Sequence, residues 1–248
     1  MLKKYFAFLL ALIALVGCAK HDPILPGNRI DVFDSVDINV KNINVPQLSE
    51  TMKNISGDEK CDFRQDASNT VWGGDRKIFS GFATESVVKS KQSPICDGGF
   101  VYVGLTTGEV IKINPKTNQV VWVADVFRAS NLTGGASVVD IVAHVGIDGN
   151  YVYAGGLGDA FCKLKKSDGA RVWCLNISVP VDFIMVDDFV FVVGTDNNLY
   201  AINAQNGDVH WKTGINKQIK PVYKNNVITV GNLRINSTDG SVVKTGWF

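Results

Sequence analysis

Five cysteines and three histidines are the residues of this chain that could bind a metal, carry redox chemistry or act as nucleophiles. None of the cysteines has the Cys-x-x-Cys spacing of zinc sites and redox dithiols. The histidines, His21, His144 and His210, are scattered without metal-ligand spacing, and the chain has no Gly-x-Ser-x-Gly nucleophile elbow. These patterns predict no catalytic residues, no bound metal and no cofactor, so we expect a protein that is not an enzyme.

Two features bear on partners that contain phosphate. The segment Gly155-Gly156-Leu157-Gly158 has the composition of a phosphate-binding loop, but residues 161–164 alternate like a strand and offer no helix N-terminus to hold an anion. With 25 basic and 24 acidic residues, the net charge of +1 gives no field that would gather nucleic acid. We therefore expect a hairpin turn in this segment and no nucleic-acid partner.

The amino terminus has the pattern of an export signal. Lys3 and Lys4 form a basic start, and an apolar run follows from Tyr5 to Val16. This run is shorter than the about 20 residues that a membrane-spanning helix needs. Residues 1–17 are therefore predicted to be a cleaved signal peptide.

Cys18 ends the sequence Leu15-Val16-Gly17-Cys18, which resembles the bacterial lipobox. The resemblance implies that Cys18 becomes the lipidated first residue of the mature chain and anchors it to a membrane, since each buried acyl CH₂ group contributes about 0.8 kcal/mol. Ala19 stands where an aspartate would retain a lipoprotein at the inner membrane, which implies the periplasmic face of the outer membrane. The alternative is a cysteine that stands by coincidence at an ordinary cleavage site.

The remaining cysteines, Cys61, Cys96, Cys162 and Cys174, allow three disulfide pairings in an exported chain. Cys162 and Cys174 flank the turn signal Ser167-Asp168-Gly169 symmetrically. A hairpin centred there would place them opposite each other, at a Cα separation of about 4.5–5.5 Å that a disulfide can bridge. The alternative is two reduced, half-buried cysteines.

Composition and turn signals predict an all-β fold. Twenty-four glycines, many aromatic and β-branched residues and no long helical periodicity indicate many short strands separated by turns. Residues 18–57 start with a polar stretch broken by Pro23 and Pro26 and then alternate only weakly, so we expect a lipid-anchored extended linker there. The folded strands are expected in residues 58–248.

The chain repeats itself after this linker. Three segments align without gaps, and in each an aromatic residue stands 20 residues before a tryptophan; the segments are Val101 to Trp122, Val152 to Trp173 and Val190 to Trp211. Each predicts a meander of three strands, and a preceding strand makes four. These preceding strands are expected near residues 93–96, 138–142, 183–186 and 219–223. Four antiparallel strands that recur at about 40 residues are the pattern of a β-propeller blade.

Two further segments extend the pattern. A degraded copy covers Val227 to Val243, with Lys244 in place of the tryptophan. The segment around Trp72 is expected to be the outer strand of another blade or the strand that closes the ring. The sequence therefore predicts a partial or small propeller of about four to five blades.

The turns and tryptophans resemble the PQQ-type repeat, whose blades end in Gly-x-x-x-Trp. Gly169 to Trp173 and Gly207 to Trp211 match this motif, whereas Asn118 replaces the glycine before Trp122. In that family the tryptophan packs between neighbouring blades. The resemblance implies that Trp122, Trp173 and Trp211 are structural anchors.

Together with the lipobox and the segment Leu25 to Ile30, the repeats resemble the BamB family of outer-membrane lipoproteins. The resemblance implies a non-enzymatic scaffold of the outer-membrane β-barrel assembly machinery that contacts the POTRA region of a BamA-like partner. Because family members form eight-bladed rings, we expect a reduced relative, a truncated gene product or a partial ring. The alternatives are a propeller related to quinoprotein (PQQ-dependent) dehydrogenases and a truncated fragment without function.

One segment breaks the repeat spacing. Trp122 and Trp173 stand 51 residues apart, against 38 for Trp173 and Trp211, so 13 extra residues lie around 127–137. Extra residues in repeat proteins form loops on one face, often the binding face. The resemblance implies that this loop holds the BamA-like partner. Within it Arg128 is the first candidate anchor, since arginine is enriched at interface hot spots. Asp140, at the border, is a second candidate that positions the loop or pairs with a basic group on the partner. The alternative is a solvated loop without a partner.

Overall fold

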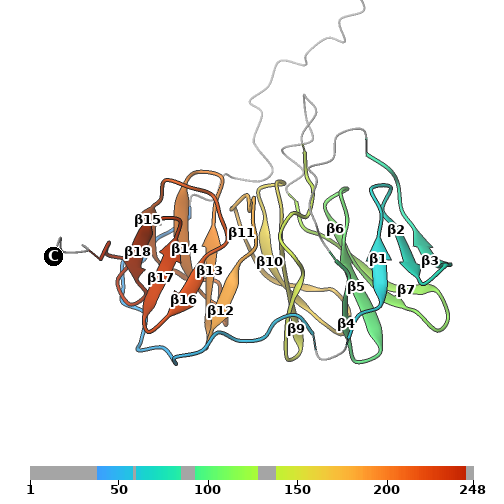
Figure 1. The fold of residues 1–248 in the computed structure, drawn as a ribbon, viewed down its shortest axis with the longest axis horizontal. Helices are drawn as coiled ribbons and strands as arrows, with labels where there is room; N and C mark the ends of the chain where they lie inside the picture. The colour runs from blue at the N-terminus through green and yellow to red at the C-terminus, as the bar shows by residue number, and fades with distance from the viewer. Residues whose placement is uncertain (1–37, 58–59, 85–92, 128–137, 244–248) are drawn as a thin grey trace, which may run out of the picture. The chain divides into compact units, whose positions relative to one another are not determined.

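The computed structural model describes residues 38–57, 60–84, 93–127 and 138–243, and within these residues all regular structure is β (Figure 1). Eighteen strands form five antiparallel sheets, and every sheet is a meander in which strands adjacent in sequence are paired. The sheets contain, in order, β1 (Phe63–Gln65), β2 (Thr70–Gly73) and β3 (Arg76–Ser80); β4 (Ile95–Asp97), β5 (Phe100–Gly104), β6 (Glu109–Asn114) and β7 (Gln119–Asp125); β8 (Gly146–Asp148), β9 (Tyr151–Gly155), β10 (Phe161–Lys165) and β11 (Arg171–Leu175); β12 (Ile184–Val186), β13 (Phe189–Val193), β14 (Asn198–Asn203) and β15 (Val209–Gly214); and β16 (Val222–Lys224), β17 (Val227–Val230) and β18 (Leu233–Asn236).

Tight turns connect the strands of each sheet. Between β16 and β17, Asn225 and Asn226 both have positive φ, 49° and 60°, and Lys224 pairs with Val227 around them. Two central residues with positive φ are the requirement of the two-residue hairpin whose twist matches that of the strands. Gly98 and Gly99 make the same kind of turn between β4 and β5.

A separate hydrophobic cluster lies between each pair of successive sheets. The first joins Val71 of the first sheet to Ile111 of the second, and three more clusters join the second to the third, the third to the fourth and the fourth to the fifth. A middle sheet is therefore covered on both faces. This explains why all five residues of β13, Phe189–Val193, are buried instead of alternating with exposed ones. The five sheets are the blades that the repeat spacing predicted.

The repeat alignment is confirmed for three blades and corrected elsewhere. The aligned segments form β5 to β7, β9 to β11 and β13 to β15. The degraded copy forms β17 and β18, which follow β16, and a single bridge between Ile235 and Val242 stands in place of an outer strand. The expectation that Trp72 lies in an outer or ring-closing strand is wrong, because Trp72 lies in β2, the middle strand of the first sheet.

The strand predicted at residues 138–142 is also wrong. Val139 and Ile141 are buried and alternate as in a strand, but the Ile141 amide donates to the carbonyl of Leu105 in the preceding blade, not to a ladder of its own sheet. The first strand of the third blade is instead β8, a few residues later. Alternating burial shows only which side chains face inward; it does not identify the backbone's partner.

Residues 38–57, which we call the strap, follow an extended path along the blades (Figure 1). Val40 makes a parallel bridge with Val209 of β15, and Val45 and Leu48 are buried in the cluster between the fourth and fifth blades. Further along, Ile55 is buried against the third and fourth blades. The strap therefore runs opposite to the chain order of the blades.

The linker predicted for residues 18–57 needs a correction on this point. The strap is extended, as expected, but it packs on the blades and contributes to two of their cores. The remaining part, together with the predicted signal peptide and Cys18, lies outside the described residues. Among the residues that the structure does describe, no helix has the length and apolar character to cross a membrane.

Candidate binding surface between the blades

The repeat tryptophans lie at the junctions between blades. Trp122 and Trp211 are 7% and 4% exposed, and Trp173 is half-buried. Each indole Nε1 donates a hydrogen bond to a main-chain carbonyl in the next blade. The acceptors are Lys166 at 3.2 Å, Ala204 at 3.2 Å and Ser237 at 3.1 Å. The large apolar ring fills the junction while its one donor is satisfied.

A β-bulge precedes each of these tryptophans. The ladder between the third and fourth strands shifts by one residue at Lys112/Ile113, at Lys163/Leu164 and at Ala201/Ile202. A bulge places two residues opposite one and re-aims the side chain that follows it. The same shift in the first blade lies between Val71 and Trp72, and it places Phe79 at the position of the tryptophan.

The glycine of each Gly-x-x-x-Trp motif, and Gly240 at the same position of the degraded copy, is required by the tryptophan of the preceding blade. Gly169, Gly207 and Gly240 have φ of 74°, 80° and 74°. A Cβ atom on them would lie 2.8 Å from the Trp122 ring, 3.0 Å from Trp173 and 2.7 Å from Trp211, respectively. Both the left-handed backbone and the close approach exclude a side chain there. Sequence reasoning missed this coupling because it joins one repeat to the next.

The exception to the motif has a structural explanation. The first blade presents Phe79 in place of tryptophan, so the turn of the second blade can carry Asn118, which takes φ of 57°. The hydrogen bond that an indole would supply comes instead from Arg76, whose Nη2 donates to the Pro115 carbonyl at 2.7 Å. The junction is therefore closed by a different pair of residues.

Two buried lysines support the junction tryptophans. The Nζ atoms of Lys112 and Lys163 donate to the same carbonyls as Trp122 and Trp173, at 3.0 Å and 2.8 Å. Each ammonium also lies over an aromatic ring, at 4.1 Å from the Phe100 centroid for Lys112 and at 3.7 Å from Tyr151 for Lys163. Burial lowers the pKa of both lysines.

One edge of the blades gathers the features that could contact a partner. It is formed by the turns after β5, β9 and β13, at residues 105–108, 156–160 and 194–197, and we call it the loop edge. Main-chain hydrogen bonds tie inter-blade segments to these turns, including Val126 N to Gly108 O, at 2.8 Å, and Thr195 N to Ser178 O, at 2.9 Å. This edge is therefore hydrogen-bonded across neighbouring blades.

The 13-residue insertion leaves and re-enters the fold at the loop edge. Phe127 and Val139, on its two sides, pack on the turns of the second and third blades. A Cβ atom on Gly108 would lie 2.7 Å from the Phe127 ring, and one on Gly158 would lie 2.5 Å from the Phe127 Cβ and 3.3 Å from the Val139 Cβ. Both ends of the insertion are thus fixed between two blades. Arg128 lies outside the described residues.

Asp140 follows the insertion and is buried. Its side chain is 1% exposed, and its carbonyl accepts a hydrogen bond from the Leu157 amide at 2.9 Å. A Cβ on Gly156 would lie only 1.9 Å from that carbonyl oxygen, so the two segments touch through backbone alone. The expectation that Asp140 pairs with a basic group on a partner is wrong because the side chain is buried. The alternative, that it positions the loop, agrees with its place.

A cleft of about 410 Å³ opens at the loop edge between the third and fourth blades. Its wall contains two carboxylates, both held in place: Ser178 Oγ donates to Asp159, and the Tyr200 hydroxyl donates to Asp196. Burial, followed by the hydrogen bond to Asp196, raises the pKa of Tyr200. The remaining lining residues are Ile38, Asn176, Ile177, Thr195 and Lys212. The cleft is polar and shares the Asp159 turn with the insertion border.

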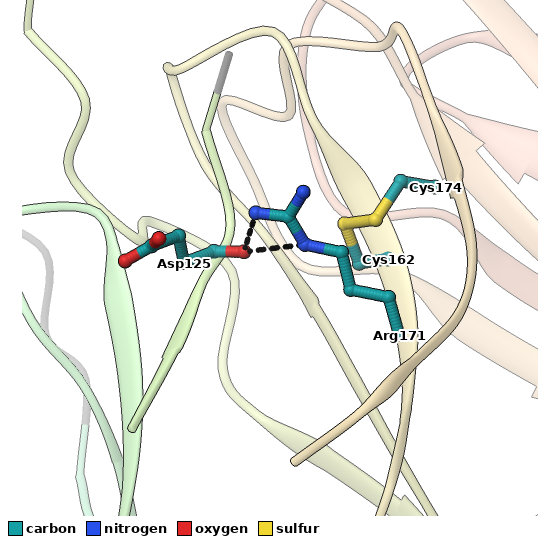
Figure 2. The surroundings of a disulfide bond; sticks show 4 residues. All are labelled: Asp125, Cys162, Arg171 and Cys174. Carbon is teal, nitrogen blue, oxygen red and sulfur yellow. Dashed lines mark hydrogen bonds between the residues drawn. A yellow bond between two sulfur atoms is a disulfide. The ribbon is translucent and has the colours of Figure 1, made fainter. Parts of the chain in front are cut away.

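Both described disulfides lie in the first three blades. Cys162 pairs with Cys174 across β10 and β11, with a Cα separation of 4.1 Å, and Cys61 pairs with Cys96 at 5.1 Å. Figure 2 shows Arg171 beside the first of them. Its Nε and Nη2 donate to the Asp125 carbonyl at the end of β7, at 3.2 and 2.7 Å, and so join two outer strands.

His144, Asp182 and Lys220 come from the same position of three successive repeats and meet in one cluster. The His144 Nδ1 and amide lie 2.7 and 2.9 Å from Asp182 Oδ1, and the Lys220 Nζ lies 3.2 Å from Asp182 Oδ2. Burial alone would raise the pKa of Asp182, but the hydrogen bonds from His144 and the charges of His144 and Lys220 outweigh it and hold the pKa below its ordinary value. The cluster ties the third, fourth and fifth blades together.

We expect Asp182→Asn to remove part of the pH dependence of stability in acid. The folded pKa of Asp182 is below the unfolded value of about 3.9, so its contribution is present above about pH 4 and is lost as the pH falls through the folded pKa. Urea unfolding between pH 2 and pH 6 measures this, and Asp75→Asn, in an exposed turn, is the control. Identical pH profiles for wild type and Asp182→Asn would contradict the assignment.

Within the described segments, no group of three or more histidine, cysteine, aspartate or glutamate residues is placed to hold a metal ion. The chemistry that the loop edge offers is instead that of a binding surface: a polar cleft, turns fixed by hydrogen bonds and an insertion with anchored ends. These are the features of loops that carry recognition on a rigid scaffold.

Comparison with known proteins gives a consistent picture. A family model described as outer membrane protein assembly factor BamB matches residues 35–231. The outer membrane protein assembly factor BamB of Legionella pneumophila (strain Paris) is 23% identical over 130 residues, which are 52% of this chain and 34% of that protein. The chain spans about a third of the length of the curated relatives that it matches, between 29% and 34%.

The solved structures similar to this chain include BamB from Moraxella catarrhalis, which is 16% identical, with a TM-score of 0.47 over 63% of this chain and 48% of that one. They also include the quinohemoprotein alcohol dehydrogenase ADHIIG from Pseudomonas putida HK5, which is 13% identical, with a TM-score of 0.51 over 73% of this chain and 40% of that one. At this identity the second likeness describes the fold alone.

Proposed function

Because this chain belongs to the family described as outer membrane protein assembly factor BamB, we propose that it is a non-enzymatic scaffold of outer-membrane protein assembly that acts through protein contacts. The observation that carries the proposal is the extent of the family match. It covers residues 35–231, which include the strap, four complete sheets and most of the fifth. The likeness to an alcohol dehydrogenase concerns the fold alone, and we do not propose that activity.

The partner we propose is the POTRA region of a BamA-like protein, bound at the loop edge. Three observations support this surface. The insertion is the largest departure from the repeat spacing, its ends are fixed by Phe127 and Val139, and the polar cleft lies at the next blade junction. A loop with anchored ends loses less conformational freedom on binding than a free one. Arg128 is the proposed anchor within the insertion, since arginine is enriched at interface hot spots.

Binding of the partner tests the proposed function directly. The mature lipoprotein, purified in detergent and immobilised, is expected to bind the periplasmic POTRA region of the BamA-like protein from the same organism saturably. The heat-unfolded lipoprotein on a parallel surface is the control for non-specific adsorption. No saturable binding by folded protein would contradict the proposal and favour a fragment without function.

We further propose that Cys18 is lipidated and holds the protein on the periplasmic face of the outer membrane. The lipobox after a basic and apolar segment supports this assignment. The intact mass of membrane-purified protein is expected to show an amino terminus at Cys18 and a diacylglyceryl-sized addition, both absent in Cys18→Ala. A mature protein that is unmodified and recovered from the soluble fraction would contradict it.

A further inference from the structure

The second half of the strap, residues 50–57, covers one edge of each of two blades. The Lys53 amide donates to the Met185 carbonyl of β12 at 2.8 Å, and the Ile55 carbonyl accepts from the Ile147 amide of β8 at 2.8 Å. These strands are the first of their sheets, so the strap occupies edges that would otherwise present unpaired main-chain groups. One ion pair, between Lys53 and Asp148 at 2.9 Å, and one buried side chain, Ile55, add to these two hydrogen bonds.

The first half of the strap is held more firmly. Its amides at Lys41, Ile43 and Val45 donate to the carbonyls of Val209, His210 and Thr238, at 2.9, 3.1 and 2.7 Å. Val45 and Leu48 are buried in the core between the fourth and fifth blades. Ser49, at the end of this half, donates its amide to Asp187 Oδ2 and accepts from the Tyr223 hydroxyl, both at 2.7 Å. Residues 50–57 are left with the two main-chain hydrogen bonds, the Lys53–Asp148 ion pair and the buried Ile55 side chain.

A disulfide compensates for this difference. Cys61 follows the strap closely and is bonded to Cys96 of β4, the first strand of the second blade. At Gly57, with φ of 84°, a Cβ atom would lie 2.3 Å from the Cys96 carbonyl, so the strap passes directly against β4 just before the bond. A covalent tether of this kind raises the effective concentration of residues 50–57 at the blade edges, so that few contacts are enough to hold them there.

We propose that the Cys61–Cys96 disulfide is a redox latch that holds the second half of the strap on the edges of β8 and β12. Cys61 is half-buried and Cys96 is 4% exposed, so a dithiol reductant would attack the Cys61 sulfur. The sulfur–sulfur bond breaks, the two cysteines take up two electrons and two protons, and the reductant ends as a disulfide. The first half of the strap stays in place, and the edges of β8 and β12 open.

Amide hydrogen exchange, measured by NMR on the full chain, tests the latch. In the variant Cys61→Ser/Cys96→Ser, the amides of Lys53 and Ile147 are expected to exchange faster by about tenfold or more, because a local opening now exposes them. The amides of Lys41, Ile43 and Val45 should keep their wild-type rates. The control variant Cys162→Ser/Cys174→Ser removes the other disulfide and should leave the Lys53 and Ile147 amides unchanged.

The same control variant covers the case in which the double serine variant does not fold. In Cys162→Ser/Cys174→Ser the Cys61–Cys96 bond is the one remaining disulfide of the two described, so dithiothreitol added to the folded protein reduces that bond alone. Exchange of the same amides is then followed over time. Unchanged exchange at Lys53 and Ile147 after reduction would overturn the proposal. Faster exchange at all five amides together would also overturn it, because the bond would then support the whole fold instead of one half of the strap.

Discussion

Replacing Trp211 with alanine is expected to lower the free energy of unfolding by about 3–5 kcal/mol, the range for large-to-small aromatic changes in a core. Trp211 is 4% exposed, packs at 5.9 Å from the Phe191 ring and faces Gly240 of the next blade. Its indole also donates to the Ser237 carbonyl, which loses its partner in the variant. The cost combines a cavity at the junction with an unsatisfied acceptor.

Urea unfolding, monitored by far-ultraviolet circular dichroism instead of tryptophan fluorescence, measures this effect. Val172→Ala, at an exposed position of β11, is the control and should change stability by less than about 0.5 kcal/mol. Trp211→Phe keeps most of the ring but not the donor, so its cost should be near the net worth of one hydrogen bond, about 1 kcal/mol, plus a small cavity. A loss below about 1 kcal/mol for Trp211→Ala would show that the junction does not depend on this side chain.

Deleting residues 128–137 is expected to weaken binding of the BamA-like POTRA region by about tenfold or more while the β content is unchanged, since a loop on a rigid scaffold can carry recognition without carrying the fold. The deletion leaves Phe127 and Val139 on their turns, where both already lie against Gly158. Circular dichroism and the urea midpoint confirm the fold before binding is measured. Equal binding by wild type and deletion would reject the insertion as the partner loop.

Arg128→Ala refines this experiment to one side chain. Truncating a hot-spot arginine costs at least about 2 kcal/mol, which is about thirtyfold in affinity. Lys116→Ala is the matched control, because it also removes one positive charge. Lys116 lies in the exposed turn between β6 and β7, at the end of these strands that is away from the loop edge. Equal losses for the two variants would mean that binding depends on net charge, and the proposed anchor would then be wrong.

The sequence predicts best what recurs within one repeat. The spacing from aromatic to tryptophan spans a meander of three strands with its two turns and a bulge, so the register of β5 to β7, β9 to β11 and β13 to β15 follows from it. Contacts that cross from one repeat to another escape such reading. The contact of Gly207 with Trp173, and the hydrogen bond from Arg76 to the Pro115 carbonyl, become visible only when neighbouring blades are placed side by side.

The strap and Asp140 show a second limit. Val45 and Leu48 enter the core between the fourth and fifth blades, and Ile55 enters the core between the third and fourth, so the three have no common period. A polar segment with irregular apolar residues has the pattern of a linker. At the candidate site, the spacing located the insertion but could not show that Asp140 faces inward. An isolated aspartate beside a loop gives no sign of its burial, since that depends on the backbone of Gly156 in another turn.

The contact between each repeat tryptophan and the glycine of the following blade determines which segment could be duplicated to add a blade. A duplicated copy of residues 174–211 carries its own Gly207 and Trp211, so after insertion behind Trp211 its glycine would receive the original tryptophan and its tryptophan would meet Gly240. The same copy placed ahead of the second blade would bring its tryptophan to Asn118, which stands at the position that is glycine in the third, fourth and fifth blades. An added blade therefore fits only where the next blade has glycine at this turn position, as it does at Gly240, and not where it has Asn118.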